Sequence, residues 1–156
     1  MPHLEIYLND HLAGATGGVE LARRLRASNQ QDPIYGAPLR RVCEEIEADR
    51  ATLEQVIERL GYTRSRAKPL GAWAMEKLGR LKLNGQLRGY SPLSRLIELE
   101  GLLIGITGKI GLWQVLSELE LGQRLEVDLE QLTARAAEQR AAVDDLHQLA
   151  ATALER

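Results

Sequence analysis

Two histidines and two carboxylates fall on otherwise apolar helical stripes, and these side chains are the ones best suited to chemistry. They are His11, Asp49, Glu100 and His147. Carboxylate and imidazole groups bind transition metals together, and they also form hydrogen-bonded pairs inside proteins. We expect a set of core groups that hydrogen-bond one another or water. A metal or small-ligand site built from the same four residues is the alternative.

The elements that must position these residues are helices. Apolar residues recur at threes and fours in several long stretches: Leu4 to Arg26, Leu39 to Leu60, Ser91 to Leu119 and Leu129 to Leu154. Ser91 and Asp128 are suited to cap the last two helices, and Gly61 is suited to end the second. No stretch alternates as a strand does, and no repeat has a period of about 20–50 residues. The sequence therefore predicts an all-α fold.

The connections between these helices differ in length. The polar stretch Ser28 to Pro38 contains proline and glycine and is expected to form the first connection. A shorter helix is predicted at about 70–83, with Pro69 in its first turn. We therefore expect one domain over residues 1–156, a four-helix bundle with a short extra helix in the connection between long helices 2 and 3.

The stretch from Ser91 to Leu119 is the most apolar part of the chain, and its leucines and isoleucines fall on nearly every helical face. A helix of that kind is expected to be covered on all sides by its neighbours. It also contains Lys109. We expect this lysine to point outward or to pair with an acid, and a catalytic amine is the alternative.

Glycines are frequent in two of the predicted helices, where each costs on the order of 1 kcal/mol relative to alanine. They are Gly14, Gly17 and Gly18 in the first helix and Gly101, Gly105, Gly108 and Gly111 in the third. The interpretation we favour is a close approach of two helix backbones. The alternative is that the glycines leave room for an apolar ligand between the helices.

Three stretches resemble those of uncharacterised bacterial proteins with the ferritin-like four-helix bundle. They are YLNDHLAG at 7–14, EIEAD at 45–49 and LEGLLIGITGK at 99–109. The resemblance covers almost the whole chain and implies that fold, with a crossover between the second and third long helices. Such a crossover would pair His11 with Asp49 at one level of the bundle, and Glu100 with His147 at another.

Ferritin-like di-iron proteins use a Glu-x-x-His pair on each of two helices and a glutamate on each of the other two. This chain contains no Glu-x-x-His, and its nearest match is Asp144-x-x-His147. The resemblance therefore implies the fold without the di-iron centre.

The composition and charge of the chain indicate which classes of binding partner to expect. The 156 residues are 44% hydrophobic and carry a net charge of -2, so we expect neither a nucleic-acid partner nor a membrane span. The stretch from Arg64 to Arg88 is basic and is expected to be a solvated surface, with contact to phosphates or an acidic partner as the alternative. The single cysteine, Cys43, excludes an intramolecular disulfide, and the N-terminus shows no secretory signal, so we expect a cytoplasmic protein.

The function we favour from the sequence is a non-catalytic structural or interaction protein that has no cofactor and forms a homodimer. The alternative is a metal- or small-ligand-binding protein, extending to a divergent metalloenzyme with a transition metal. It would use the polar residues inside the bundle, His11, Asp49, Glu100 and His147.

Overall fold

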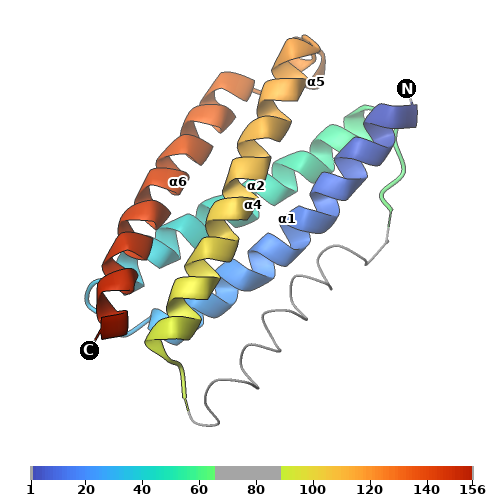
Figure 1. Cartoon of the computed structure of the whole chain (residues 1–156). Helices are drawn as coiled ribbons and strands as arrows, with labels where there is room; N and C mark the ends of the chain where they lie inside the picture. The colour runs from blue at the N-terminus through green and yellow to red at the C-terminus, as the bar shows by residue number, and fades with distance from the viewer. Residues whose placement is uncertain (1, 66–88, 156) are drawn as a thin grey trace.

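The computed structural model describes residues 2–65 and 89–155, and these parts are helical without strands. The long helices are α1 (Pro2–Asn29), α2 (Gly36–Arg59), α4 (Pro92–Glu118) and α6 (Leu129–Ala151) (Figure 1). The short helix α5 (Gly122–Leu125) joins α4 to α6, and a 3-10 turn (Thr152–Glu155) follows α6. The prediction of an all-α fold with four long helices is confirmed. The short helix predicted at about 70–83 lies outside the described residues.

The helices begin and end largely where the sequence places them. The Ser91 side chain accepts a hydrogen bond from the backbone N–H of Ser94 at 3.1 Å, and Asp128 accepts one from Gln131 at 2.8 Å. Gly61 follows α2 with a φ of +73°, a conformation that glycine adopts readily.

The first connection is shorter than predicted, because α1 continues to Asn29 and α2 begins at Gly36. The Asn29 side chain donates to the carbonyl of Leu25 within the last turn of α1. Asp32 then accepts hydrogen bonds from the backbone N–H groups of Ile34 and Tyr35, which forms the tight turn into α2. At the other end of the chain, the last helix becomes a 3-10 turn after Ala151.

The helices α2 and α4 run in the same direction (Figure 1). Just after α2, Thr63 bonds to Glu5 and Asn9 in the first turns of α1. Just before α4, Tyr90 accepts a hydrogen bond from Asn29 at the last residue of α1. The connection between α2 and α4 therefore joins opposite ends of the bundle.

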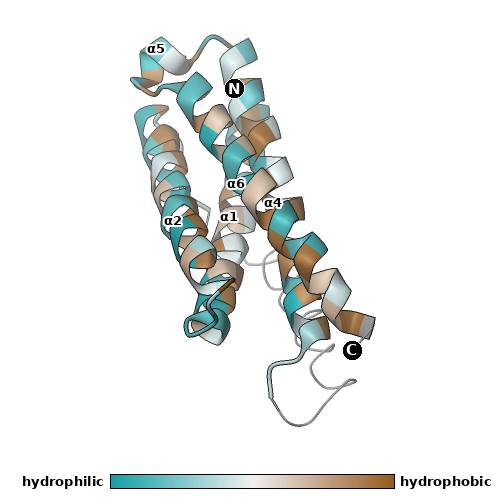
Figure 2. Ribbon diagram, turned by 90° about the vertical axis from the view of Figure 1, so that its left-hand side faces the viewer, coloured by the Kyte–Doolittle hydropathy of each residue, from teal (hydrophilic) through white to brown (hydrophobic). Residues whose placement is uncertain are grey.

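Two antiparallel pairs make up the bundle, α1 with α2 and α4 with α6. Helix α1 also packs against α4, and α6 packs less closely against α2. The helices α2 and α4 thus occupy opposite corners and face each other along a diagonal. Hydrophilic and hydrophobic residues share each long helix, as Figure 2 shows from the side.

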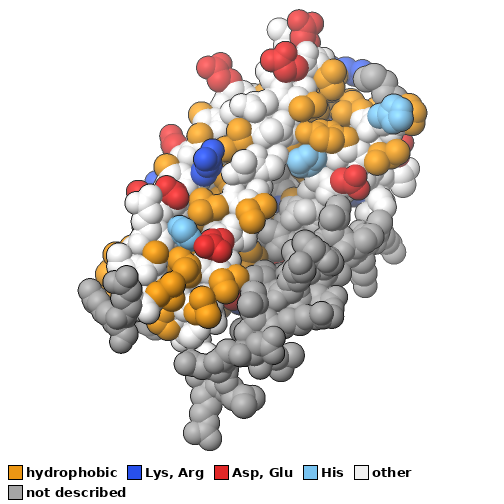
Figure 3. Space-filling view, viewed as in Figure 1, with side chains coloured by type: hydrophobic (Ala, Val, Ile, Leu, Met, Phe, Trp, Pro, Cys, Tyr) orange, Lys and Arg blue, Asp and Glu red, His pale blue; other side chains and the backbone are white. Residues whose placement is uncertain are grey.

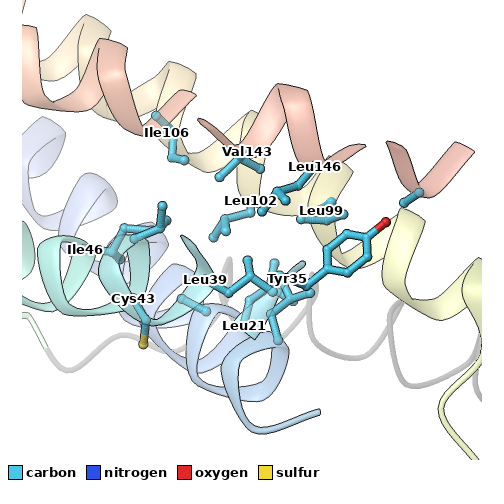
Figure 4. Packing of buried hydrophobic residues seen from close by; sticks show 14 of the residues in the cluster. Leu21, Tyr35, Leu39, Cys43, Ile46, Leu99, Leu102, Ile106, Val143 and Leu146 are labelled. Atoms are coloured by element: carbon cyan, nitrogen blue, oxygen red, sulfur yellow. The ribbon is translucent and has the colours of Figure 1, made fainter. Parts of the chain in front are cut away.

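The buried apolar residues form two clusters along the bundle axis. One lies toward the end where α1 finishes and α2 begins, and Figure 4 shows it with Tyr35, Leu99 and Val143 among its members. The other contains Leu8, Val56, Trp113 and residues of the α4–α6 connection. The polar residues described below lie at the middle of the bundle and at its Asn29 end.

The prediction that the third long helix is covered on all sides is wrong. Ile104 is 75% exposed, and Leu93 and Val115 are also exposed. The physical reason is that α4 occupies a corner of the bundle and packs mainly against α6 and α1. Its outer face therefore stays uncovered by the other described helices. Figure 3 shows hydrophobic side chains gathered on this side of the molecule.

Candidate functional site

A buried carboxylate lies at the centre of the bundle. Asp49 on α2 is only 2% exposed and accepts hydrogen bonds from three side chains on two other helices. Lys109 on α4 donates to its Oδ2 at 2.5 Å, and Arg135 on α6 donates to its Oδ1. Gln139 on α6 donates to Oδ2 at 3.1 Å and accepts from Lys109 at 2.5 Å. The carboxylate is therefore fully engaged.

This central cluster contains more positive than negative charge, because one carboxylate faces two cations. Burial lowers the pKa of Lys109, the neighbouring Asp49 raises it, Arg135 adds to the lowering and Glu45 raises it. The expectation that Lys109 pairs with an acid is confirmed. Because ion pairs of low exposure are costly to break, this cluster fixes how α2, α4 and α6 pack.

Lys109 and Asp49 also border a pocket of about 310 Å³ between α1, α2 and α4. Apolar side chains and glycines form most of its wall, and a few polar residues join them. The lining residues are Tyr7, Asp10, His11, Gly14, Ala15, Gly18, Ile46, Asp49, Arg50, Leu53, Gly101, Leu102, Gly105, Ile106, Gly108, Lys109, Leu112 and Trp113.

Most of the glycines in this wall face open space. A Cβ atom built on Gly14, Gly18, Gly105 or Gly108 would meet no atom within 4 Å. Close approach of two backbones is therefore the wrong interpretation for these residues. It holds better at Gly101, where a Cβ would lie 3.1 Å from the Leu21 side chain. Gly14, Gly105 and Gly108 are exposed, so these glycines keep the pocket open to its surroundings instead of tightening the helix contact.

Two buried donors beside the pocket lack acceptors. The indole Nε1 of Trp113, a residue that is 0% exposed, has no hydrogen-bond partner within the described parts of the chain. The same holds for Nε of Arg50, whose Nη2 pairs with Glu54 at 3.0 Å. A buried N–H without a partner costs about 1–3 kcal/mol. Both N–H groups lie beneath the pocket surface, so an acceptor in the pocket would reach them only after the covering side chains shift.

His11, a residue of α1, also borders the pocket. Its ring lies 4.6 Å from that of Tyr7, edge to face, and the residue is half-buried. Burial lowers the pKa of His11 more than the neighbouring Asp10 raises it, so the imidazole is neutral near pH 7. It can then donate or accept one hydrogen bond at the pocket.

The structure separates the four residues that the sequence singled out. His11 and Asp49 border the same pocket, but Asp49 uses its oxygens on α4 and α6. Glu100 and His147 hydrogen-bond to each other at 3.1 Å, and Glu100 is 52% exposed. Among the residues that the structure describes, no three His, Cys, Asp or Glu side chains cluster in a way that could hold a metal ion.

Sequence reasoning missed the partners of Asp49. Gln139 is 1% exposed and continues the apolar spacing of α6, since it lies between Ala136 and Val143. That spacing was a usable signal for a buried amide. Arg135 gave no such signal, because it lies beside the stripe and reaches Asp49 with a long side chain.

A second buried acid, Glu98 on α4, was also missed. It is 2% exposed and accepts hydrogen bonds from Arg24 Nε at 2.7 Å and from the Tyr90 hydroxyl at 3.0 Å. Burial, opposed in part by the hydrogen bond from Asn29, raises the pKa of Tyr90. Arg95 completes the group by donating to Asn29 at 2.8 Å. The group has its partners within itself and fastens the start of α4 to the end of α1.

The cysteine, the basic stretch and the helices' apolar character add no further candidate site. Cys43 is buried, and burial raises the pKa of its thiol, which is the behaviour of a core residue. Most of the basic stretch from Arg64 to Arg88 lies outside the described residues, and Arg64 itself pairs with Glu54 and Glu58. No helix in the described ranges has the length and apolar character needed to cross a membrane.

Comparisons of the chain with protein-family models, with curated proteins and with solved structures find no match. The functional assignment therefore rests on the central cluster and the pocket beside it.

Proposed function

We propose that this protein binds a small, largely apolar molecule in the pocket between α1, α2 and α4. The observation that carries the proposal is the set of glycines, Gly14, Gly18, Gly105 and Gly108, that line the pocket and face open space. Alanine at each position would favour the helix by about 1 kcal/mol without a clash. A chain that forgoes this stabilisation at several places in one wall retains space there, as ligand-binding proteins do.

The size and lining of the pocket support this proposal. Its volume of about 310 Å³ lies at the lower end of the range found for small-molecule sites, roughly 300–1,000 Å³. Such sites combine apolar walls with a few polar groups that fix the orientation of the ligand. Here Leu53, Leu102 and Ile106 supply apolar surface, while Lys109 and His11 supply polar atoms.

The proposal includes a ferritin-like arrangement of the helices. It is supported by the common direction of α2 and α4 and by a connection that joins opposite ends of the bundle. In such folds ligands lie between facing helices, which is also the place of this pocket. The protein would use this place for an organic ligand, and its polar central cluster would hold the helices around it.

The proposal is tested with an apolar fluorescent dye, N-phenyl-1-naphthylamine, whose emission rises when it leaves water. We expect saturable binding to the wild type and loss of binding in Gly105→Leu, because the new side chain would fill the pocket. The matched control is Gly111→Leu, since Gly111 lies on the same helix, faces open space and does not line the pocket.

Each variant is first shown to be folded by circular dichroism and urea unfolding. Dye binding that is unchanged in Gly105→Leu would exclude the pocket as the site. Equal loss of binding in both variants would also contradict the proposal, because the effect would then not depend on the pocket.

A further inference from the structure

The charges around the pocket indicate which class of ligand it accepts. We infer that the ligand is an amphipathic anion, a carboxylate with an apolar body, and that its charged end meets Lys109 and Trp113. This inference rests on the proposed function, and it adds the chemical class of the molecule bound.

The polar groups at the inner wall are hydrogen-bond donors. Lys109 has three N–H bonds, and Asp49 and Gln139 accept two of them. Trp113 lies four residues after Lys109 on α4, about 6 Å along the axis, and its N–H has no partner among the described residues. Both residues line the pocket, where Lys109 keeps one N–H without a named acceptor, but the Trp113 N–H is buried beneath the pocket surface. A ligand acceptor beside Lys109 satisfies both donors once the side chains that cover the indole shift.

The central cluster behind this wall carries more positive than negative charge, because Arg135 joins it without lining the pocket. Asp49 shares its single negative charge between Lys109 and Arg135, so these three residues keep one positive charge in excess. Glu45 also acts on Lys109, but Arg41 pairs with Glu45 at 2.8 Å. In a wall of low exposure, a positive charge attracts an anion more strongly than it would in water. Arg50, next to Asp49 on α2, also lines the pocket and has an unpartnered Nε within the described chain, although Glu54 neutralises its charge.

The acids that border the pocket do not cancel this preference. Asp49 has both oxygens occupied by donors from α4 and α6. Asp10 lies on α1 and is exposed, so water and salt screen its charge. His11, on the same helix, is neutral near pH 7 because burial lowers its pKa. The inner wall is thus the positive end of the pocket.

The remaining surface of the pocket is apolar and suits a hydrocarbon or aromatic body. Ile46 and Leu53 come from α2, and Ile106 and Leu112 come from α4. A ligand with a neutral polar end would leave the excess positive charge of Lys109 and Arg135 over Asp49 unbalanced. A ligand with a cationic end would be repelled by it.

The test compares ligands of one chain length that differ only in the charge of the end group. Octanoate, 1-octanol and octylamine are titrated against bound N-phenyl-1-naphthylamine at pH 7.5. We expect octanoate to displace the dye at a concentration at least about tenfold lower than octylamine does, which is the size of one charge-assisted hydrogen bond. Octanol is expected to fall between them.

Two variants place the preference at the inner wall. Lys109→Met keeps the length of the side chain but removes its charge, and it should lower the affinity for octanoate about tenfold while that for octanol stays unchanged. Trp113→Phe keeps an aromatic ring but removes the N–H, and it should lower octanoate affinity severalfold. This second variant leaves the ion pairs of Asp49 in place, so it serves if Lys109→Met does not fold.

The outcomes separate this inference from the proposed function. Equal displacement by octanoate, octanol and octylamine, with Gly105→Leu still abolishing dye binding, would overturn the anion preference and leave the pocket as a binding site. An octanoate preference that persists unchanged in both Lys109→Met and Trp113→Phe would also overturn it. If the wild type binds neither dye nor octanoate, the proposed function falls as well.

Discussion

Asp49 on α2 and Lys109 on α4 form an ion pair across the diagonal of the bundle, with 2.5 Å between Oδ2 and Nζ. Both residues also line the pocket. The interaction that holds the two helices in register is therefore part of the wall of the proposed site. Substitutions in this wall should change stability and ligand binding together, whereas substitutions at the glycines should change them in opposite directions.

Removing the buried charge of Asp49 should destabilise the protein strongly. In Asp49→Asn, Lys109 and Arg135 face each other without a counterion, and we expect the free energy of unfolding to fall by about 3–5 kcal/mol. Urea unfolding at pH 7 measures the change. The control is Glu58→Gln, which breaks the ion pair between the exposed residues Glu58 and Arg64 and should cost less than about 1 kcal/mol. Similar losses in the two variants would contradict the importance of the central cluster.

Alanine in the pocket wall should stabilise the protein. We expect Gly105→Ala and Gly18→Ala each to raise the free energy of unfolding by about 0.5–1 kcal/mol, because alanine favours the helix and its Cβ meets nothing within 4 Å. Gly36→Ala should instead lower it by about 1–3 kcal/mol, because its Cβ would lie 3.0 Å from the Gln30 carbonyl oxygen. Chemical denaturation of the three variants measures their free energies of unfolding. A loss of stability in Gly105→Ala would show that the wall is closely packed.

Two neighbouring arginines should differ sharply in their contribution. Arg24 is 25% exposed and pairs with the buried Glu98, while Arg23 is 60% exposed and pairs with Glu47. Arg24→Met should lower the free energy of unfolding by about 3 kcal/mol, because it leaves a buried carboxylate without its cation. Arg23→Met, the matched control, should change it by less than about 1 kcal/mol. The comparison uses thermal and urea unfolding at pH 7, and equal effects would argue against a buried Glu98.

Stability should decrease on the acid side through His11. Its pKa in the folded protein lies below its ordinary value of 6.5, so the folded state resists protonation. The stabilisation is complete above pH 6.5 and is lost as the pH falls through 6.5 toward the folded value. The other titratable groups near His11 at the pocket are Tyr7, Asp10, Arg50 and Lys109. They are unchanged in a variant that replaces His11 alone, so their contribution to the pH dependence is retained.

The variant His11→Phe keeps the aromatic contact with Tyr7 but removes the titration. We expect the variant and the wild type to be closer in stability at pH 8 than at pH 5. Between pH 8 and pH 5 the variant should lose less stability than the wild type does. The measurement is the urea midpoint at each pH. An identical pH dependence in the two proteins would show that His11 is not desolvated in the fold.

Much of the helical layout follows from local signals. Ser91 and Asp128 carry capping side chains, and Gly61 takes the left-handed conformation, so the ends of α4, α6 and α2 were predictable. These features depend on a few neighbouring residues. The tight turn at Asp32 was placed less well, because its length depends on the hydrogen bonds of Asn29 and Asp32 to nearby backbone.

The buried and exposed faces of α4 could not be predicted from local signals. Its apolar residues surround the helix, so the sequence does not show which face meets α6 and α1. That is why Glu100 was singled out, although it is half-exposed, and Glu98 was missed, although it is buried. The outcome depends on the corner position of α4, which is a property of the whole bundle.

The glycines illustrate the same limit. Their spacing fits both close packing and an open pocket, and only the positions of the neighbouring helices separate the two. Gly101 meets Leu21, whereas Gly105, one turn later, meets nothing within 4 Å. Asp49 was placed correctly on the inner stripe of α2, but its partners on α4 and α6 depend on tertiary packing.

The indole N–H of Trp113 gives the most direct test of the pocket as a ligand site. It has no acceptor among the described residues, and Trp113→Phe assigns its signal in a ¹H–¹⁵N correlation spectrum. On titration with octanoate, we predict a saturable downfield shift of this signal in the wild type and in Gly111→Leu, and no shift in Gly105→Leu. A signal that does not move in the wild type, or that moves equally in Gly105→Leu, would contradict the account.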